Sequence, residues 1–198
     1  MLWGIIGLGL LLRLPLLSQS LWLDEAIQAL ALQGHYGNLW SYALSDFQPP
    51  LYHYLLSAWT SIFGYSEIAL RTPSLLAGVF TIYFVYLLGG KLGGSKIGLF
   101  ASLLAATNPL LIYYSAEGRT YALTTFLVTA SMYYFLQLAS STSGHNTKYK
   151  IQYTLFTTLS LWTSYLAWLM VIVQGYYLLR RRNYRTLLHL CFAALTLL

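Results

Sequence analysis

The sequence has 198 residues, of which 58% are hydrophobic and only 8% are charged. A soluble globular domain carries about 25% charged residues, so a chain this poor in charge cannot cover a surface that faces water. The composition excludes an ordinary soluble domain and indicates an integral membrane protein. The net charge of +6 does not indicate a nucleic-acid partner, because the basic residues cluster in short loops between apolar runs, as topology signals do.

The apolar runs predict an all-α, polytopic bundle in which each span is a helix, because backbone polar groups in lipid must pair within their own segment. Several runs approach or exceed the roughly 18 residues typical of a membrane span. We expect spans at about residues 2–17, 68–89, 97–114, 120–138, 151–163, 166–179 and 186–198. One long span over 151–179 is the alternative to two short ones. Because the last run stops at Leu198, we expect the N-terminal part of a longer transmembrane domain.

The segment between the first two spans is predicted to carry short helices. Asp24–Gln33 is one candidate, with Asp24 near its N-cap. Leu51–Phe63 follows two prolines, which suit the start of a helix. At about 1.5 Å per residue it reaches roughly 20 Å, too short to cross a membrane comfortably, so we expect it to lie at the interface. A further short helix is expected at residues 39–44.

Basic residues predict the orientation of the bundle. They lie at Lys91 and Lys96, at Lys148 and Lys150, and within Arg180–Arg185. Basic loops prefer the cytoplasm. Counting spans from these loops places Asp24, Glu25 and Glu117 together on the outer, or periplasmic, face of the plasma (inner) membrane.

The adjacent acids Asp24 and Glu25 are two of only five acidic residues in the chain. The simple interpretation is that Asp24 caps a helix, since acids are favoured in the first turn. The functional interpretation joins them to Glu117, which interrupts two apolar runs, as a general base, a divalent metal site, or both, with Asp24 and Glu117 as candidate metal ligands. Glu117 has its own simple alternative, a surface turn with an internal ion pair to Arg119.

Three arginines are predicted near the outer interface: Arg13, Arg71 and Arg119. Guanidinium groups match phosphate oxygens, so these residues are candidates for holding a lipid phosphate. Snorkelling to lipid headgroups is the alternative for each of them. The single cysteine, Cys191, allows neither a disulfide within the chain nor a cysteine metal site.

Four motifs occur in a specific order. They are Trp22-Leu-Asp-Glu-Ala26, Gln48-Pro-Pro-Leu-Tyr52, Phe63-Gly-x-Ser-Glu-x-x-x-Arg71-x-Pro-Ser74 and Tyr114-Ser-Ala-Glu-Gly-Arg-Thr-Tyr121. In this order they resemble the N-terminal half of the GT-C membrane glycosyltransferases, in particular glycosyltransferase family 39 with its protein mannosyltransferase-like and aminoarabinose-transferase-like members. The resemblance covers about residues 1–175.

The resemblance implies a membrane helical bundle of the GT-C type whose first external loop carries two short interfacial helices. It also implies transfer of a sugar, with inversion, from a polyprenyl-phosphate donor to an acceptor hydroxyl of a protein, lipid or glycan. Asp24 is then the candidate general base with Glu25 assisting, and Glu117 orients the acceptor or binds a divalent metal. The candidate substrate-binding residues are Arg71, Arg119, Tyr121, His53 and Gln48. Many relatives carry a basic residue at the position of Gln48, whereas the neutral Gln48 offers no cation to the donor phosphate.

Two other functions remain open from the sequence. A transporter or flippase for lipid-linked sugars would use the same arginines without needing Asp24. A truncated, non-catalytic membrane module that assembles with partners is the other alternative.

Overall fold

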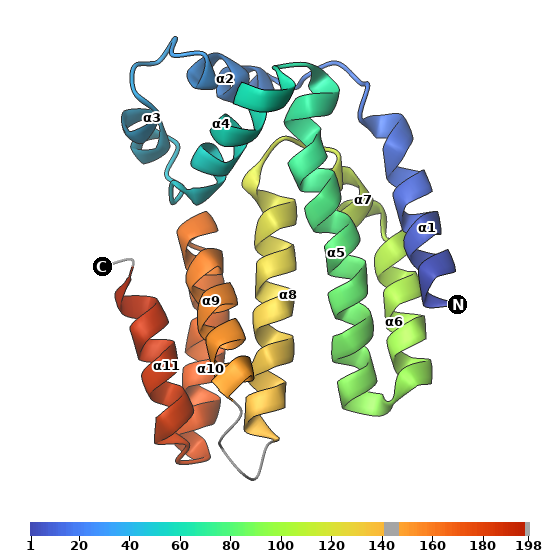
Figure 1. Cartoon of the computed structure of the whole chain (residues 1–198), viewed down its shortest axis with the longest axis vertical. Helices are drawn as coiled ribbons and strands as arrows, with labels where there is room; N and C mark the ends of the chain where they lie inside the picture. The colour runs from blue at the N-terminus through green and yellow to red at the C-terminus, as the bar shows by residue number, and fades with distance from the viewer. Residues whose placement is uncertain (141–146, 197–198) are drawn as a thin grey trace.

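The computed structural model describes residues 1–140 and 147–196, and every regular element in this part of the chain is a helix. A helical bundle stands below three helices that connect α1 (Leu2–Arg13) to α5 (Glu67–Gly93) and that we call the short helices (Figure 1). The bundle contains α1, α5, α6 (Ser95–Thr107), α7 (Pro109–Ser115), α8 (Thr120–Ala139), α9 (Thr147–Thr163), α10 (Ala167–Arg180) and α11 (Tyr184–Leu195), with a 3₁₀ turn, η1 (Leu14–Leu16), after α1. The short helices are α2 (Leu23–Leu32), α3 (Leu39–Ser45) and α4 (Leu51–Phe63). The predicted helical membrane bundle is confirmed as the fold class.

α5 is the central helix and packs against both α6 and α8. It begins where the Ser66 hydroxyl accepts a hydrogen bond from the Ala69 N–H. It ends at Gly94, whose φ of +87° is a conformation that glycine adopts readily. α6 then returns so close to α5 that a Cβ added at Gly98 would lie 2.6 Å from the carbonyl oxygen of Tyr86. Glycine is therefore required for this close helix contact.

The run predicted as a span at residues 97–114 is broken into α6 and α7, which are bent by 61° relative to each other. Asn108 lies at the break, and its side chain accepts a hydrogen bond from the Leu111 N–H (3.0 Å). Pro109 has no N–H with which to continue the hydrogen bonding of α6. The Asn-Pro pair thus ends one helix and begins the next, a break that the predicted spans did not include.

α9 and α10 are separated by residues 164–166, so residues 151–179 do not form one continuous helix. Both helices pack with α8 and α11 around a core that includes Tyr153, Leu161 and Leu178. Inside it, the Tyr153 hydroxyl donates to Gln174 Oε1 (2.8 Å). The last two residues of the span predicted at 186–198 lie outside the described residues.

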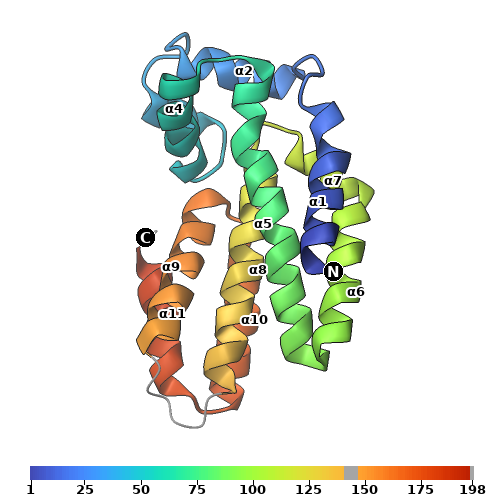
Figure 2. The same cartoon turned by 45° about the vertical axis from the view of Figure 1, so that its right-hand side comes forward.

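By length and composition, α5 and α8 can each cross a membrane, and the bent pair α6–α7 can do so if it counts as one span. α11 and the run formed by α1 and η1 are shorter apolar helices. The turned view places α1 beside α6 and α7, with α9 and α11 on the other side of α5 and α8 (Figure 2).

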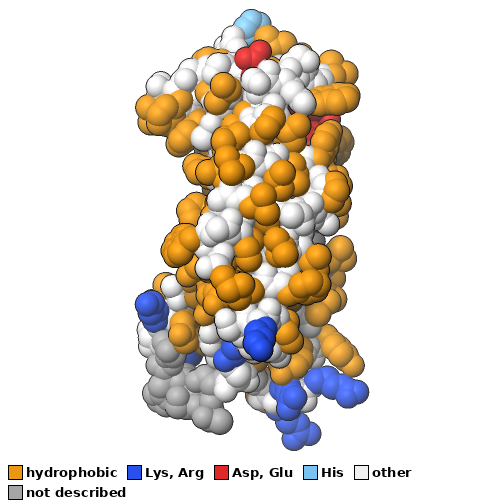
Figure 3. Space-filling view, turned by 90° about the vertical axis from the view of Figure 1, so that its right-hand side faces the viewer, with side chains coloured by type: hydrophobic (Ala, Val, Ile, Leu, Met, Phe, Trp, Pro, Cys, Tyr) orange, Lys and Arg blue, Asp and Glu red, His pale blue; other side chains and the backbone are white. Residues whose placement is uncertain are grey.

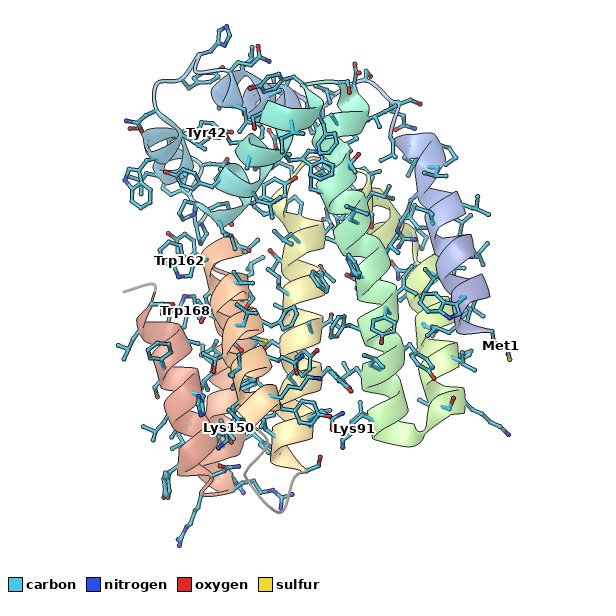
Figure 4. The ribbon with its side chains drawn as sticks, in the orientation of Figure 1. Met1, Tyr42, Lys91, Lys150, Trp162 and Trp168 are labelled. Carbon is cyan, nitrogen blue, oxygen red and sulfur yellow. The ribbon has the colours of Figure 1, made fainter. Side chains whose placement is uncertain are left out.

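The two ends of the molecule differ in charge. In the face shown in Figure 3, acidic side chains lie at the end formed by the short helices, and lysine and arginine side chains lie at the opposite end. In Figure 4, Tyr42 marks the end formed by the short helices, and the labelled Lys91 and Lys150 lie towards the opposite end. We call the first end, formed by α2, α3, α4 and the α7–α8 turn at residues 116–119, the acidic end.

Candidate active site at the acidic end

Glu25 is buried and joins three parts of the acidic end. Its Oε1 accepts hydrogen bonds from Arg71 Nε (2.9 Å) and from the Gly118 N–H (2.7 Å). Its Oε2 accepts from Arg71 Nη2 (2.6 Å) and from the Trp22 N–H (3.1 Å). Because α2, α5 and the α7–α8 turn all meet at this carboxylate, Glu25 fixes their relative positions.

The pKa of Glu25 is lowered even though the residue is buried. Desolvation is the largest influence and raises the pKa, but the hydrogen bonds from Arg71, Gly118 and Trp22, with the charge of Arg71, outweigh it. A carboxylate that accepts several hydrogen bonds and has a lowered pKa is a poor proton acceptor. The geometry therefore gives Glu25 the character of a scaffold residue.

Arg71 is held by protein acceptors on all sides, and its side chain is 2% exposed. In addition to Glu25, it donates through Nη1 to three carbonyl oxygens between Leu16 and Gln19, at 2.6–3.2 Å. Its Nη2 also donates to the carbonyl oxygen of Ser20 (3.1 Å). All three guanidinium nitrogens are engaged, so Arg71 ties the end of the first span to α5.

Asp24 has the opposite environment to its neighbour. It is exposed on the first turn of α2, and none of the hydrogen bonds found in the described residues involves its side chain. The predicted cap of this helix is provided by Glu25 instead, whose carboxylate accepts the N–H of the N-cap residue Trp22. The Asp24 carboxylate is thus open to a ligand approaching the acidic end.

Glu117 lies half-buried in the α7–α8 turn. Its Oε2 is buried and, within residues 1–140 and 147–196, has no hydrogen-bond partner. Together with Arg71 it borders a small cavity of about 30 Å³. Burial first, and then the negative charges of Glu25 and Asp24, raise the pKa of Glu117, while Arg119 opposes this change. Glu117 is therefore the carboxylate of the site with raised proton affinity.

Arg119 pairs with Asp46, not with Glu117. Its Nη1 and Nη2 each lie 3.4 Å from Asp46 Oδ1, and Asp46 Oδ2 lies 3.6 Å from His53 Nε2. The other ring nitrogen of His53 is 2.9 Å from Gln28 Nε2. The sequence reasoning missed Asp46, although its rarity as one of five acids was a signal that could have found it.

His53 is buried within this group. Burial lowers its pKa and the charge of Asp46 opposes the change, so the imidazole is neutral at pH 7. In the neutral ring, Nδ1 accepts the hydrogen bond from Gln28 and Nε2 carries the proton facing Asp46. The 3.6 Å separation is longer than a hydrogen bond, and His53 Nε2 has no hydrogen-bond partner among the described residues.

A second polar link joins α4 and α5 to the start of α8. The Tyr52 hydroxyl lies 3.1 Å from Ser74 Oγ, which donates to the carbonyl oxygen of Arg119 (3.3 Å). Tyr121 packs against Tyr114 with ring centroids 4.7 Å apart. Tyr121 is 37% exposed and lies in the first turn of α8, two residues after Arg119.

Gln48 lies beside a cavity of about 410 Å³ between the α3–α4 loop and the α9–α10 turn. Trp40, Trp162 and Trp168 also line it, and Figure 4 shows the last two beneath the short helices. Gln48 Oε1 has no hydrogen-bond partner in the described structure. The cavity thus has aromatic walls, and the Gln48 Oε1 atom beside it is buried in the described structure.

Arg13 does not reach the site. It is fully buried in the bundle and donates to Ser115 Oγ and to the carbonyl oxygens of Gly9 and Ala106. The prediction that it binds a lipid phosphate is wrong, because its guanidinium faces the broken helix α6–α7.

Among the described residues, no three His, Cys, Asp or Glu side chains lie together as a metal site. Asp24 and Glu117 supply two carboxylates at the same end of the molecule. Mg²⁺ is often held by one or two carboxylates, with substrate phosphates and water completing its shell. The unpartnered Oε2 of Glu117 is compatible with such a substrate-completed site.

A sequence model described as dolichyl-phosphate-mannose-protein mannosyltransferase matches residues 47–198. The chain belongs to this mannosyltransferase family. The match confirms the resemblance to family 39-like GT-C membrane glycosyltransferases, and it includes the turn with Glu117 and Arg119 but begins after Asp24 and Glu25.

This member of the mannosyltransferase family is also similar to an uncharacterised protein of Aquifex aeolicus (strain VF5). The two are 32% identical over 87 residues, which cover 43% of this chain but only 17% of that protein. No solved structure matches the chain.

Proposed function

We propose that this chain is part of a membrane glycosyltransferase that moves a sugar from a polyprenyl-phosphate donor to an acceptor hydroxyl at the outer face of the membrane. Membership of the mannosyltransferase family supports the reaction class. The observation that carries the proposal is the division of the acidic pair. Glu25 is locked in a buried scaffold, whereas Asp24 is exposed at the end that also holds Glu117 and Arg119.

Asp24 acts as the general base in this proposal. It takes the proton of the acceptor hydroxyl as the hydroxyl oxygen bonds to the anomeric carbon. The bond from that carbon to the phosphate oxygen breaks, and the lipid phosphate leaves with the bonding electrons. Direct attack from the opposite side inverts the anomeric centre.

Arg119 is the candidate for contacting the departing phosphate. Its bonds to Asp46 are long, at 3.4 Å, so its guanidinium can turn towards a stronger anion. Arg71, by contrast, has all its nitrogens engaged and serves to hold Glu25. Asp24 and Glu117 are the carboxylates that would hold a divalent cation, which would neutralise phosphate charge.

Three further residues take supporting roles in this proposal. Gln48 lines the aromatic cavity, where its side-chain amide is the candidate for pairing with a sugar hydroxyl. The exposed side chain of Tyr121 offers a stacking face. His53 lies beside Asp46, the partner of Arg119, and does not touch the substrate.

The proposal is tested with the full-length parent protein in membranes, supplied with a labelled polyprenyl-phosphate sugar. Asp24→Asn removes the base but keeps the shape, and we expect transfer to fall by about 10²–10⁴-fold while donor binding persists. Glu67→Gln is the matched control, because Glu67 is an exposed acid at the first turn of α5. It should transfer like the wild type.

A parallel reaction with a chelator tests the cation. We expect transfer to be lost with the chelator and to recover when Mg²⁺ or Mn²⁺ is added.

Equal transfer by wild type and Asp24→Asn would remove Asp24 from the chemistry. Donor binding without transfer by any variant, across several sugars, would favour a carrier of lipid-linked sugars over a transferase.

A further inference from the structure

Arg13 is a buried arginine that has no carboxylate partner within residues 1–140 and 147–196. Its Nε donates to Ser115 Oγ (3.1 Å), and its Nη1 donates to the carbonyl oxygens of Gly9 (2.7 Å) and Ala106 (3.0 Å). Its Nη2 lies 3.4 Å from the carbonyl oxygen of Ala105. In the part of the chain that the structure describes, no acidic side chain lies within ion-pair distance of it. A buried charge bound only to neutral acceptors requires an explanation.

The break between α6 and α7 leaves two backbone carbonyl oxygens without their helical hydrogen bonds. In a continuous helix, the carbonyl of Ala105 would accept from residue 109, but Pro109 has no N–H. The carbonyl of Ala106 would accept from Leu110, but the axis turns by 61° at this point. Arg13 donates to both carbonyl oxygens. Broken helices at membrane depth persist only where other groups pair with the freed backbone atoms, and Arg13 does so here.

Two glycines let the three helices meet around this guanidinium. A Cβ at Gly78 of α5 would lie 2.7 Å from Ser115 Cβ and would clash with Ser115 Oγ. A Cβ at Gly9 of α1 would clash with Ile82 and lie 3.3 Å from Ala106 Cβ. The two glycines therefore allow α1, α5 and the α6–α7 break to pack closely around Arg13.

The turn that carries Glu117 is held from both sides. On one side, Ser115 is the last residue of α7 and accepts the hydrogen bond of Arg13. On the other side, the Gly118 N–H donates to Glu25. Glu117 lies between these two fixed points, so its position depends on both.

We propose that Arg13 is a positioning residue, which fixes the α6–α7 bend and, through Ser115, sets the place of the Glu117 carboxylate at the acidic end. The catalytic consequence rests on the proposed function, but the positioning itself does not. Arg13 acts through Ser115 and does not contact the substrate.

The first test measures position without using activity. Glu117→Cys is introduced into the full-length protein with its other cysteines replaced, and the rate at which a maleimide alkylates the introduced thiol is measured. Ser115→Ala removes the acceptor for Arg13 Nε and leaves the bonds of Arg13 to the carbonyls. Arg13→Lys keeps the charge but cannot reach these acceptors together. Both changes should raise the alkylation rate of the introduced thiol several-fold, because the turn loses one of its two anchors.

Ser131→Ala is the matched control. Ser131 is also fully buried and shares one hydroxyl hydrogen bond, 2.7 Å long, with Thr157 between α8 and α9. This variant should lower the melting temperature about as much as Ser115→Ala does. It should leave the alkylation rate of the introduced thiol unchanged, because it does not touch the break.

The second test uses transfer kinetics on proteins that retain Glu117. Ser115→Ala should lower kcat by about tenfold, with KM for the donor unchanged, because a misplaced carboxylate affects the chemical step more than donor binding. An unchanged alkylation rate in both Ser115→Ala and Arg13→Lys would overturn the proposal. A raised alkylation rate in a protein that transfers no sugar would support the positioning role and reject the proposed reaction.

Discussion

At the scale of single residues, two adjacent carboxylates have opposite fates. Successive side chains on a helix point about 100° apart, so Asp24 and Glu25 cannot both face the interior of the protein. Glu25 faces Arg71 and Gly118, and Asp24 faces outward. Removing one partner of a buried ion pair costs about 3–5 kcal/mol because the other charge is left unpaired. Glu25 thus stabilises the fold, and its neighbour Asp24 is the candidate reactive residue.

The lowered pKa of Glu25 predicts how stability depends on pH. A carboxyl group with a lowered folded-state pKa stabilises the protein fully above its unfolded value, here 4.5. That contribution is lost as the pH falls through the folded-state pKa, because the unfolded chain then binds more protons. Melting temperatures between pH 7 and pH 3 should therefore fall more steeply in the wild type than in Glu25→Gln. Parallel curves would contradict this assignment, and Glu67→Gln should follow the wild type.

At the scale of elements, the shape of α5 decides where α7 can lie. Gly78 faces Ser115 at close range, whereas a Cβ at Gly90 would meet nothing within 4 Å. Gly78→Ala should lower the free energy of unfolding by about 1–3 kcal/mol through overpacking. Gly90→Ala in the same helix should be neutral or stabilising by up to about 1 kcal/mol, because alanine favours helix. Similar melting temperatures for the two variants would contradict the close contact.

The elements also show how far the sequence predicts the structure. The predicted segment Leu51–Phe63 has the same bounds as α4. The two prolines before it predict its start, and in the structure Gly64 lies at its end. The bend at Pro109 was not predicted, although the residue before a proline disfavours helix. Hydropathy measures how apolar a run of residues is and does not show whether the helix axis bends within that run.

The candidate site was predictable only in part. Counting spans brought Asp24 and Glu117 to one end of the molecule, since basic loops fix orientation. The partners of Arg13, Arg71 and Arg119 were not predictable, because each bond joins segments far apart in the sequence. The bond from Arg13 to Ser115, for example, spans 102 residues. Such pairs depend on which helices pack together.

At the scale of the whole molecule, the separation of charge predicts one orientation in the membrane. Cysteines are placed at His35, exposed at the acidic end, and at Ser95, exposed at the start of α6, with native cysteines replaced. A membrane-impermeant thiol reagent should label position 35 in whole cells and position 95 only after permeabilisation. The reverse pattern would place the candidate site in the cytoplasm and overturn the outer-face proposal.

Of the two adjacent acids, Asp24 is assigned to catalysis and Glu25 to holding the structure. One paired measurement tests this assignment. Sugar transfer and melting temperature are measured on the same preparations of wild type, Asp24→Asn and Glu25→Gln. Asp24→Asn should lose transfer while its melting temperature stays unchanged, and Glu25→Gln should lose several degrees of melting temperature. Asp24→Asn with wild-type transfer, or Glu25→Gln with wild-type stability, would contradict it.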